Sequence, residues 1–147
     1  MRCLLPPFFF LLCVVIMALL NGYVPLVRFV AYPWNLLGVV DLVGGLAITL
    51  VAGSQFMRAK TNLKTFDRPD HLVTTGLFKY SRNPMYLGFV IAAFGVAFYL
   101  GSLAPFFIVV LFIFVADRWY VAFEERIMAD VFGADYEKYK NSVRRWI

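Results

Sequence analysis

Long apolar runs alternate with short polar segments along this chain. Residues 3–22 carry no charged side chain, residues 35–57 carry one, Asp41, and residues 83–116 again carry none. A membrane-spanning helix needs about 20 consecutive apolar residues, so each of the first two runs predicts one span. The third run is too long for a single span, and glycine, serine and proline interrupt it at residues 101–105. It predicts a helical hairpin, which brings the total to about four spans.

The composition agrees with a membrane environment. Hydrophobic residues make up 62% of the 147 residues, and the mean hydropathy is +0.76, whereas a typical soluble domain is about 45–50% apolar. A soluble body of this size exposes too much surface to bury so many apolar side chains. We therefore expect an all-α integral membrane protein of one domain. Residues 1–57 would form two N-terminal spans, and residues 58–147 would form the functional core.

Basic residues are concentrated in two polar segments, 58–82 and 117–147. Together these segments hold all but two of the 14 lysines and arginines, whereas the predicted hairpin turn holds none. Basic segments usually face the cytoplasm, so we expect both there, with the hairpin turn outside. The second segment begins with the pattern of an amphipathic helix that leaves the membrane. We accordingly expect a multi-pass protein of the cell inner membrane, with its functional site facing the cytoplasm.

The residue inventory disfavours some classes of function. The net charge is +5, but no soluble segment has a basic stripe with interleaved aromatics, so nucleic acid is not an expected partner. His71 is the single histidine, and Cys3 and Cys13 both lie in the first apolar run, so no metal site is predicted. Asp41 fits equally well a functional intramembrane carboxylate and a side chain at the interface.

Polar residues that could carry chemistry gather at the predicted cytoplasmic ends of the last two spans. Asn83 and Pro84 are favoured at the N-cap and first position of a helix, and a helix start beside Arg82 attracts an anion such as a carboxylate. Glu124 and Glu125 could bind an ammonium group or a ribose diol. Both features also have structural explanations, namely an arginine that snorkels to the interface and a solvated helix face with ion pairs.

Four segments with a defined spacing resemble a known family. They are residues 71–76, residues 82–88, the pair Glu124-Glu125, and Phe132-Gly133 followed by Tyr136 and Tyr139. Together they look like the membrane methyltransferases related to isoprenylcysteine carboxyl methyltransferase and phospholipid (phosphatidylethanolamine) methyltransferase, over a little more than half of the chain. The resemblance implies a small all-helical membrane core that binds S-adenosylmethionine, with these residues at the cofactor: Gly76, Asn83, Tyr86, Glu124 and Glu125.

A methyl donor of this kind assigns further candidate roles. The methyl group sits on a positively charged sulfur, to which Tyr80, Tyr86 or Tyr136 could present a ring face. Arg82 or Arg118 could orient a carboxylate acceptor, which needs no base. We expect the acceptor to be a lipophilic small molecule that reaches the site between helices, among membrane lipids.

The chemical nature of the acceptor stays open at this point. An amine acceptor must lose a proton, and His71 is the one ordinary base for that near neutral pH. Isoprenylcysteine carboxyl methyltransferases usually have histidine at the position of Asn83, and asparagine there is similar to the phosphatidylethanolamine methyltransferases. Two other classes are kept as alternatives: a membrane reductase that binds NADPH in a similar helical core, and a non-enzymatic four-span protein. The sequence leaves the oligomeric state open.

Overall fold

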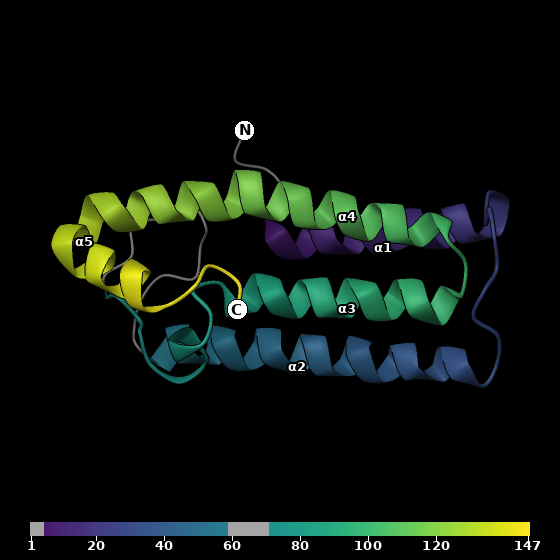
Figure 1. The fold of residues 1–147 in the computed structure, drawn as a ribbon, viewed down its shortest axis with the longest axis horizontal. Helices are drawn as coiled ribbons and strands as arrows, with labels where there is room; N and C mark the ends of the chain where they lie inside the picture. The colour runs from purple at the N-terminus through teal and green to yellow at the C-terminus, as the bar shows by residue number, and fades with distance from the viewer. Residues whose placement is uncertain (1–4, 59–70) are drawn as a thin grey trace.

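The computed structural model describes residues 5–58 and 71–147 as a bundle of long helices (Figure 1). The sequence Asp67-Arg68-Pro69-Asp70, which is typical of a turn, lies outside these ranges. The long helices are α1 (Pro6–Tyr23), α2 (Leu37–Arg58), α3 (Pro84–Leu100), α4 (Ala104–Val115) and α5 (Ala122–Ser142). Three short helices connect them: the 3-10 helices η1 (Trp34–Leu36) and η2 (Gly76–Lys79), and the π-helix η3 (Ala116–Val121).

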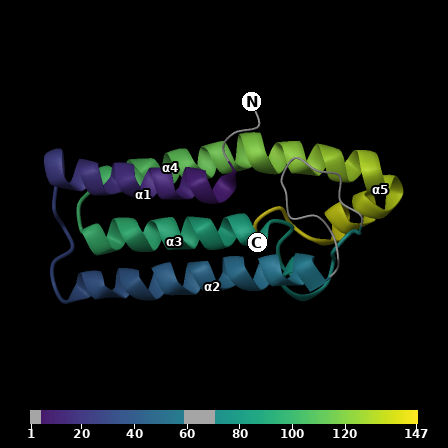
Figure 2. The same cartoon turned by 180° about the vertical axis from the view of Figure 1, so that it is seen from behind.

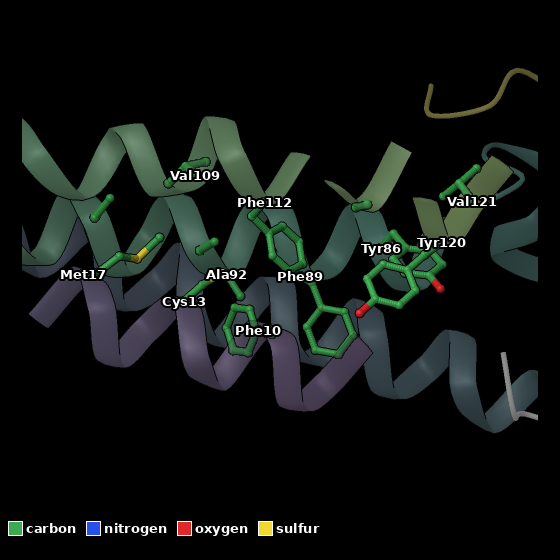
Figure 3. Packing of buried hydrophobic residues seen from close by; sticks show 13 residues of the cluster. Phe10, Cys13, Met17, Tyr86, Phe89, Ala92, Val109, Phe112, Tyr120 and Val121 are labelled. Atoms are coloured by element: carbon green, nitrogen blue, oxygen red, sulfur yellow. The ribbon is translucent and has the colours of Figure 1, made fainter. Parts of the chain in front are cut away.

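Helix α3 lies at the centre of the bundle. Figures 1 and 2 show α2 on one side of it and the pair α1 and α4 on the other, in agreement with the contacts of α1 with α3 and α4. Between these helices lies a buried aromatic cluster (Figure 3), in which the Phe10 ring of α1 is 5.1 Å from that of Phe89 and 6.1 Å from that of Phe112. Burial of these rings holds α1, α3 and α4 together.

Glycines allow α2 and α3 to pack with their backbones in close contact. A Cβ atom added at Gly45 of α2 would lie 2.4 Å from the carbonyl oxygen of Gly88, and one added at Gly95 of α3 would lie 2.5 Å from that of Gly38. The hydroxyl of Thr49 donates a hydrogen bond across the same interface to the carbonyl of Met85, at 3.1 Å. Small residues and interhelical hydrogen bonds of this kind hold helices together in membranes.

The predicted all-helical membrane fold is confirmed. Three helical stretches are long and apolar enough to cross a membrane: Pro6–Tyr23, Trp34–Arg58 and Ala104–Ser142. Pro84–Leu100 is apolar but shorter. The protein is thus a multi-pass, all-helical membrane protein. The exact number of crossings and their direction remain predictions.

The predicted hairpin consists of α3 and α4, joined by a tight turn in which Gly101 has a φ of +73°. The connection between α1 and α2 is tied to this turn. The hydroxyl of buried Ser102 donates to Oδ1 of Asn21 at 2.7 Å, and the amide of Leu103 donates to the carbonyl of Val27 at 2.9 Å. These bonds close the end of the bundle that lies opposite α5 (Figure 1).

Helix α4 continues through η3 into α5 without a break, so the helix that begins at Ala104 extends beyond Asp117. Unlike α4, α5 is rich in charged residues. Gly133 has a φ of +49° and a ψ of −119°, outside the helical region, and the chain bends there. The second half of α5 therefore returns toward the start of α3 (Figure 1). The Tyr139 hydroxyl then donates to the carbonyl of Phe78 in η2, at 2.7 Å.

Candidate functional site

A cavity of about 60 Å³ lies where α3 begins, between the end of α2, the segment around η2, and α5. Both polar and apolar side chains line it. The polar ones are Arg82, Asn83, Tyr86, Glu124, Glu125, Tyr136 and Tyr139, and the apolar ones include Phe56, Leu72, Phe78, Met85 and Met128. The cavity thus combines carboxylates, a guanidinium, aromatic rings and an apolar wall in one place.

The start of α3 forms as predicted, but the side chain of Asn83 has a different task from capping. Asn83 is the N-cap and Pro84 follows it, yet no side-chain cap bond forms. Its Nδ2 donates instead to the carbonyl of Arg145 at 3.1 Å, and its backbone amide donates to Oγ of Ser81, also at 3.1 Å. Asn83 therefore links the helix start to the segment of residues 143–147.

Tyr86 lies one turn into α3 and contacts α5 across the cavity. Its hydroxyl donates to Oε1 of Glu124 at 2.7 Å, which is short, as expected for a bond to a carboxylate. The Tyr86 ring is buried and stacks against that of Tyr120, with 6.1 Å between the ring centres (Figure 3). This packing fixes the ring while its hydroxyl reaches the cavity.

Glu125 is held by two arginines. Nη2 of Arg82 lies 2.9 Å from Oε1, and Arg145 donates to the same oxygen through Nε at 3.2 Å and to Oε2 through Nη2. Only 9% of the Arg82 side chain is exposed, and its buried Nε has no hydrogen-bond partner among the residues that the structure describes. A buried donor in this condition favours an acceptor supplied by a ligand.

Burial and a hydrogen bond shift the pKa values of three groups contributed by α5 and the segment after it. It raises the pKa of Tyr136 to about 12, and the negative charge of Glu125 acts in the same direction. Burial likewise raises the pKa of Tyr139. The hydrogen bond to Glu125 raises the pKa of the Arg145 guanidinium. Near neutral pH the two tyrosines are therefore neutral hydroxyl groups, and Arg145 is a cation.

The structure brings most of the residues predicted for the cofactor together and leaves others outside the cavity. Those that line it are Asn83, Tyr86, Glu124, Glu125 and Tyr136. Arg82, which was predicted to orient an acceptor, lines it as well. Gly76 opens η2 with a φ of +63°, and a Cβ there would lie 2.2 Å from Nε2 of Gln55. Glycine is therefore required for the conformation of this loop, and Gly76 does not line the cavity.

Three candidates lie away from the cavity. The side chain of Arg118 is 74% exposed and lies 3.5 Å from Asp117, Tyr80 is 77% exposed, and His71 is exposed. Their suggested roles remain predictions. Within residues 5–58 and 71–147, no group of three histidine, cysteine, aspartate or glutamate side chains is placed to hold a metal ion.

Sequence reasoning missed Asp117 and Arg145 as parts of this region. Asp117 lies in the π-helix and accepts hydrogen bonds from Nη1 of Arg145 at 3.2 Å and from the indole of Trp146 at 3.0 Å. The π-helix was the structural signal, because such turns are common at functional sites. Nothing in the sequence marks it, and Arg145 looks like one more cytoplasmic positive charge beside Arg144.

Comparison with known proteins now identifies the family. The sequence profile of the phospholipid methyltransferases matches residues 34–135, which include the cavity residues of α3 and the glutamate pair. The chain therefore belongs to the phospholipid methyltransferase family, and the resemblance noted in the sequence is confirmed. No solved structure matches the chain significantly.

Named relatives include methyltransferases with different acceptors. The chain is 42% identical over 86 residues to protein-S-isoprenylcysteine O-methyltransferase of Saccharomyces cerevisiae (55% of this chain, 34% of that protein). It is 39% identical over 77 residues to the Schizosaccharomyces pombe protein of that name (50% and 32%) and 36% identical over 76 residues to methanethiol S-methyltransferase 1 of Bradyrhizobium diazoefficiens (51% and 25%). The aligned part of the chain spans about a third or less of each relative.

Proposed function

We propose that this protein is a membrane methyltransferase that uses S-adenosylmethionine. The observation that supports this most is the convergence of the start of α3 and the glutamate pair of α5 on one cavity. Family membership supports the reaction class, and the alternatives of an NADPH-dependent reductase or a non-enzymatic protein gain no support from the relatives.

The lining residues suit this cofactor, which has a carboxylate, an ammonium group, a sulfonium, ribose hydroxyls and a base with an aromatic face. The unpartnered Nε of Arg82 can donate to a carboxylate. Glu124 and Glu125 can accept from an ammonium group or from ribose, and the rings of Tyr86 and Tyr136 can face a cation. Phe56 and the other apolar side chains on the opposite wall provide a surface for the base.

The cofactor supplies a methyl group that is electrophilic without further activation. The residues of the cavity have to bind the cofactor, orient it toward the acceptor and exclude water. Correct orientation of two reactants lowers the barrier by several kcal/mol. Tyr136, with its raised pKa, remains a neutral donor in this task. Small-molecule pockets usually enclose roughly 300–1,000 Å³, so we expect the cavity walls to move apart when the cofactor binds.

The acceptor in this proposal is a lipophilic molecule with a polar head at the cytoplasmic interface. Phe56 of α2 and Met85 of α3 give the cavity an apolar side. A lipid-soluble molecule can approach along these two helices. Arg82 can orient an anionic head, and an amine acceptor would instead require a base such as His71. In this proposal the chain crosses the membrane four times, and the site faces the cytoplasm.

The test is binding and turnover by the purified protein in detergent. We expect S-adenosylhomocysteine to bind in a calorimetric titration and NADPH not to bind. Binding of NADPH alone would favour the reductase, and binding of neither would favour a non-enzymatic role. With labelled S-adenosylmethionine, we expect label in a total lipid extract rather than in a pool of soluble metabolites. Label found solely in water-soluble product would refute a membrane-borne acceptor.

A further inference from the structure

Arg145 contacts α5, the π-helix η3 and the residues at the start of α3. Its guanidinium donates to both oxygens of Glu125 on α5 and to Oδ1 of Asp117 in η3. Its carbonyl accepts from Nδ2 of Asn83 at 3.1 Å and from Oγ of Ser81 at 3.4 Å, both at the start of α3. One residue of the 143–147 segment therefore connects the two elements from which the polar cavity residues come.

Arg145 acts on Glu125 from outside the cavity. Arg82 lines the cavity and contacts Oε1 of Glu125, whereas Arg145 is absent from the lining and takes both oxygens. Two guanidiniums thus share this carboxylate. A guanidinium that contacts both oxygens fixes the plane of a carboxylate as well as its position.

The position of Arg145 is itself fixed. The indole of the next residue, Trp146, donates to the Asp117 oxygen that also accepts from Arg145. The backbone amide of Arg82 donates to the carbonyl of Arg144 at 3.0 Å. The 143–147 segment is therefore anchored on both sides of Arg145, which makes Arg145 a rigid support and not a loosely held surface charge.

We propose that Arg145 is a positioning residue of the cofactor site. It holds the carboxylate of Glu125 and the amide of Asn83 in the orientations that the ligand meets, without touching the ligand itself. This inference rests on the proposed function, since it takes the cavity as the site for S-adenosylmethionine. Without the Arg145 side chain, Glu125 keeps the contact with Arg82 alone, so its carboxylate becomes poorly oriented toward the cofactor.

The experiment compares Arg145→Gln with Arg144→Gln, a matched control because the neighbouring side chain is exposed. S-adenosylhomocysteine is titrated into each purified variant, and thermal unfolding is recorded in parallel. We expect Arg145→Gln to weaken binding about tenfold or more and Arg144→Gln to bind like wild type. Arg145→Lys should bind more tightly than Arg145→Gln but less tightly than wild type. Lysine supplies the positive charge but cannot contact both carboxylate oxygens as a guanidinium does.

A second variant separates positioning from a general loss of structure. If Arg145 acts through Glu125, then Arg145→Gln should weaken binding much less in a Glu125→Gln background than in wild type. Equal effects in both backgrounds, or wild-type affinity of Arg145→Gln, would overturn the inference. Failure of the wild-type protein to bind S-adenosylhomocysteine would instead refute the proposed function, so the two failures are distinguishable.

Discussion

At the scale of single residues, the hydrogen bond from Tyr86 to Glu124 connects two residues that line the cavity. It joins α3 to α5 across 38 positions of sequence, at 2.7 Å. The buried, stacked ring of Tyr86 leaves its hydroxyl few other positions. Glu124 is thereby held at the cavity surface, where the proposed function assigns it a contact with the cofactor.

Replacement of Glu124 by glutamine should therefore weaken ligand binding more than it weakens the fold. Glutamine preserves the shape and can still accept from Tyr86, but it removes a charge. Loss of a charge-assisted hydrogen bond costs about 1.5–3 kcal/mol, so we expect the Kd for S-adenosylhomocysteine to rise about ten- to a hundredfold in calorimetry. Glu137→Gln is the control, since Glu137 is an exposed glutamate of the same helix. Equal affinities for both variants would contradict the assignment of Glu124.

Single residues were partly readable from sequence. Asn83 was placed correctly at the start of a helix, because caps follow local rules, but its bond to residue 145 depends on a fold that no local pattern encodes. Arg82 and Arg118 look alike in sequence, since each lies at the end of an apolar run. Packing alone separates them, with Arg82 buried against Glu125 and Arg118 exposed.

The interface between α2 and α3 yields a prediction at the scale of the element. A methyl group at Gly45 would meet the carbonyl of Gly88 and the amide of Ala92, at 2.4 and 2.5 Å, both of them backbone atoms that cannot move aside alone. We expect Gly45→Ala to destabilise the protein by about 1–3 kcal/mol, the usual cost of overpacking. The measurement is thermal unfolding of the purified protein in detergent.

Gly44 provides the matched control, because nothing lies within 4 Å of a Cβ atom built there. Gly44→Ala should leave the unfolding temperature unchanged or raise it slightly, since alanine favours helix over glycine by up to about 1 kcal/mol. A similar loss of stability in both variants would contradict close packing as the cause, because helix propensity alone would stabilise both.

The elements themselves were largely predictable. Uninterrupted apolar runs gave the helices, and the glycine and proline near residues 101–105 gave the hairpin, because both depend on composition over many residues. The π-helix η3 and the bend at Gly133 were not predicted. Each departs from α-helical geometry over only a few residues, which is too short a stretch for a pattern read over many residues to reveal.

At the scale of the whole molecule, the distribution of basic residues predicts that the hairpin turn and α5 lie on opposite sides of the membrane. Ser102 is unsuitable as a reporter because it is buried. Tyr32 and Lys138 are exposed at the two ends of the bundle. With Cys3 and Cys13 replaced by alanine, we expect a membrane-impermeant maleimide to label Tyr32→Cys in intact cells.

Lys138→Cys should react solely after the cells are permeabilised, which serves as the internal control for access. Labelling of both positions in intact cells would contradict a cytoplasmic α5. A version of each variant that keeps Cys13 reports on unfolding. The Cys13 thiol is buried, so its labelling would show that the bundle has unfolded.

The separation of α1 from α2 by α3 has a consequence for biogenesis. The two helices made first pack against helices that the ribosome has yet to synthesise, α1 against α3 and α4, and α2 chiefly against α3. Contacts between residues far apart in sequence form late. Both early helices should therefore reside in lipid as solitary segments until the hairpin inserts between them, so a chain that stalls before residue 84 leaves two orphaned helices for membrane quality control to remove.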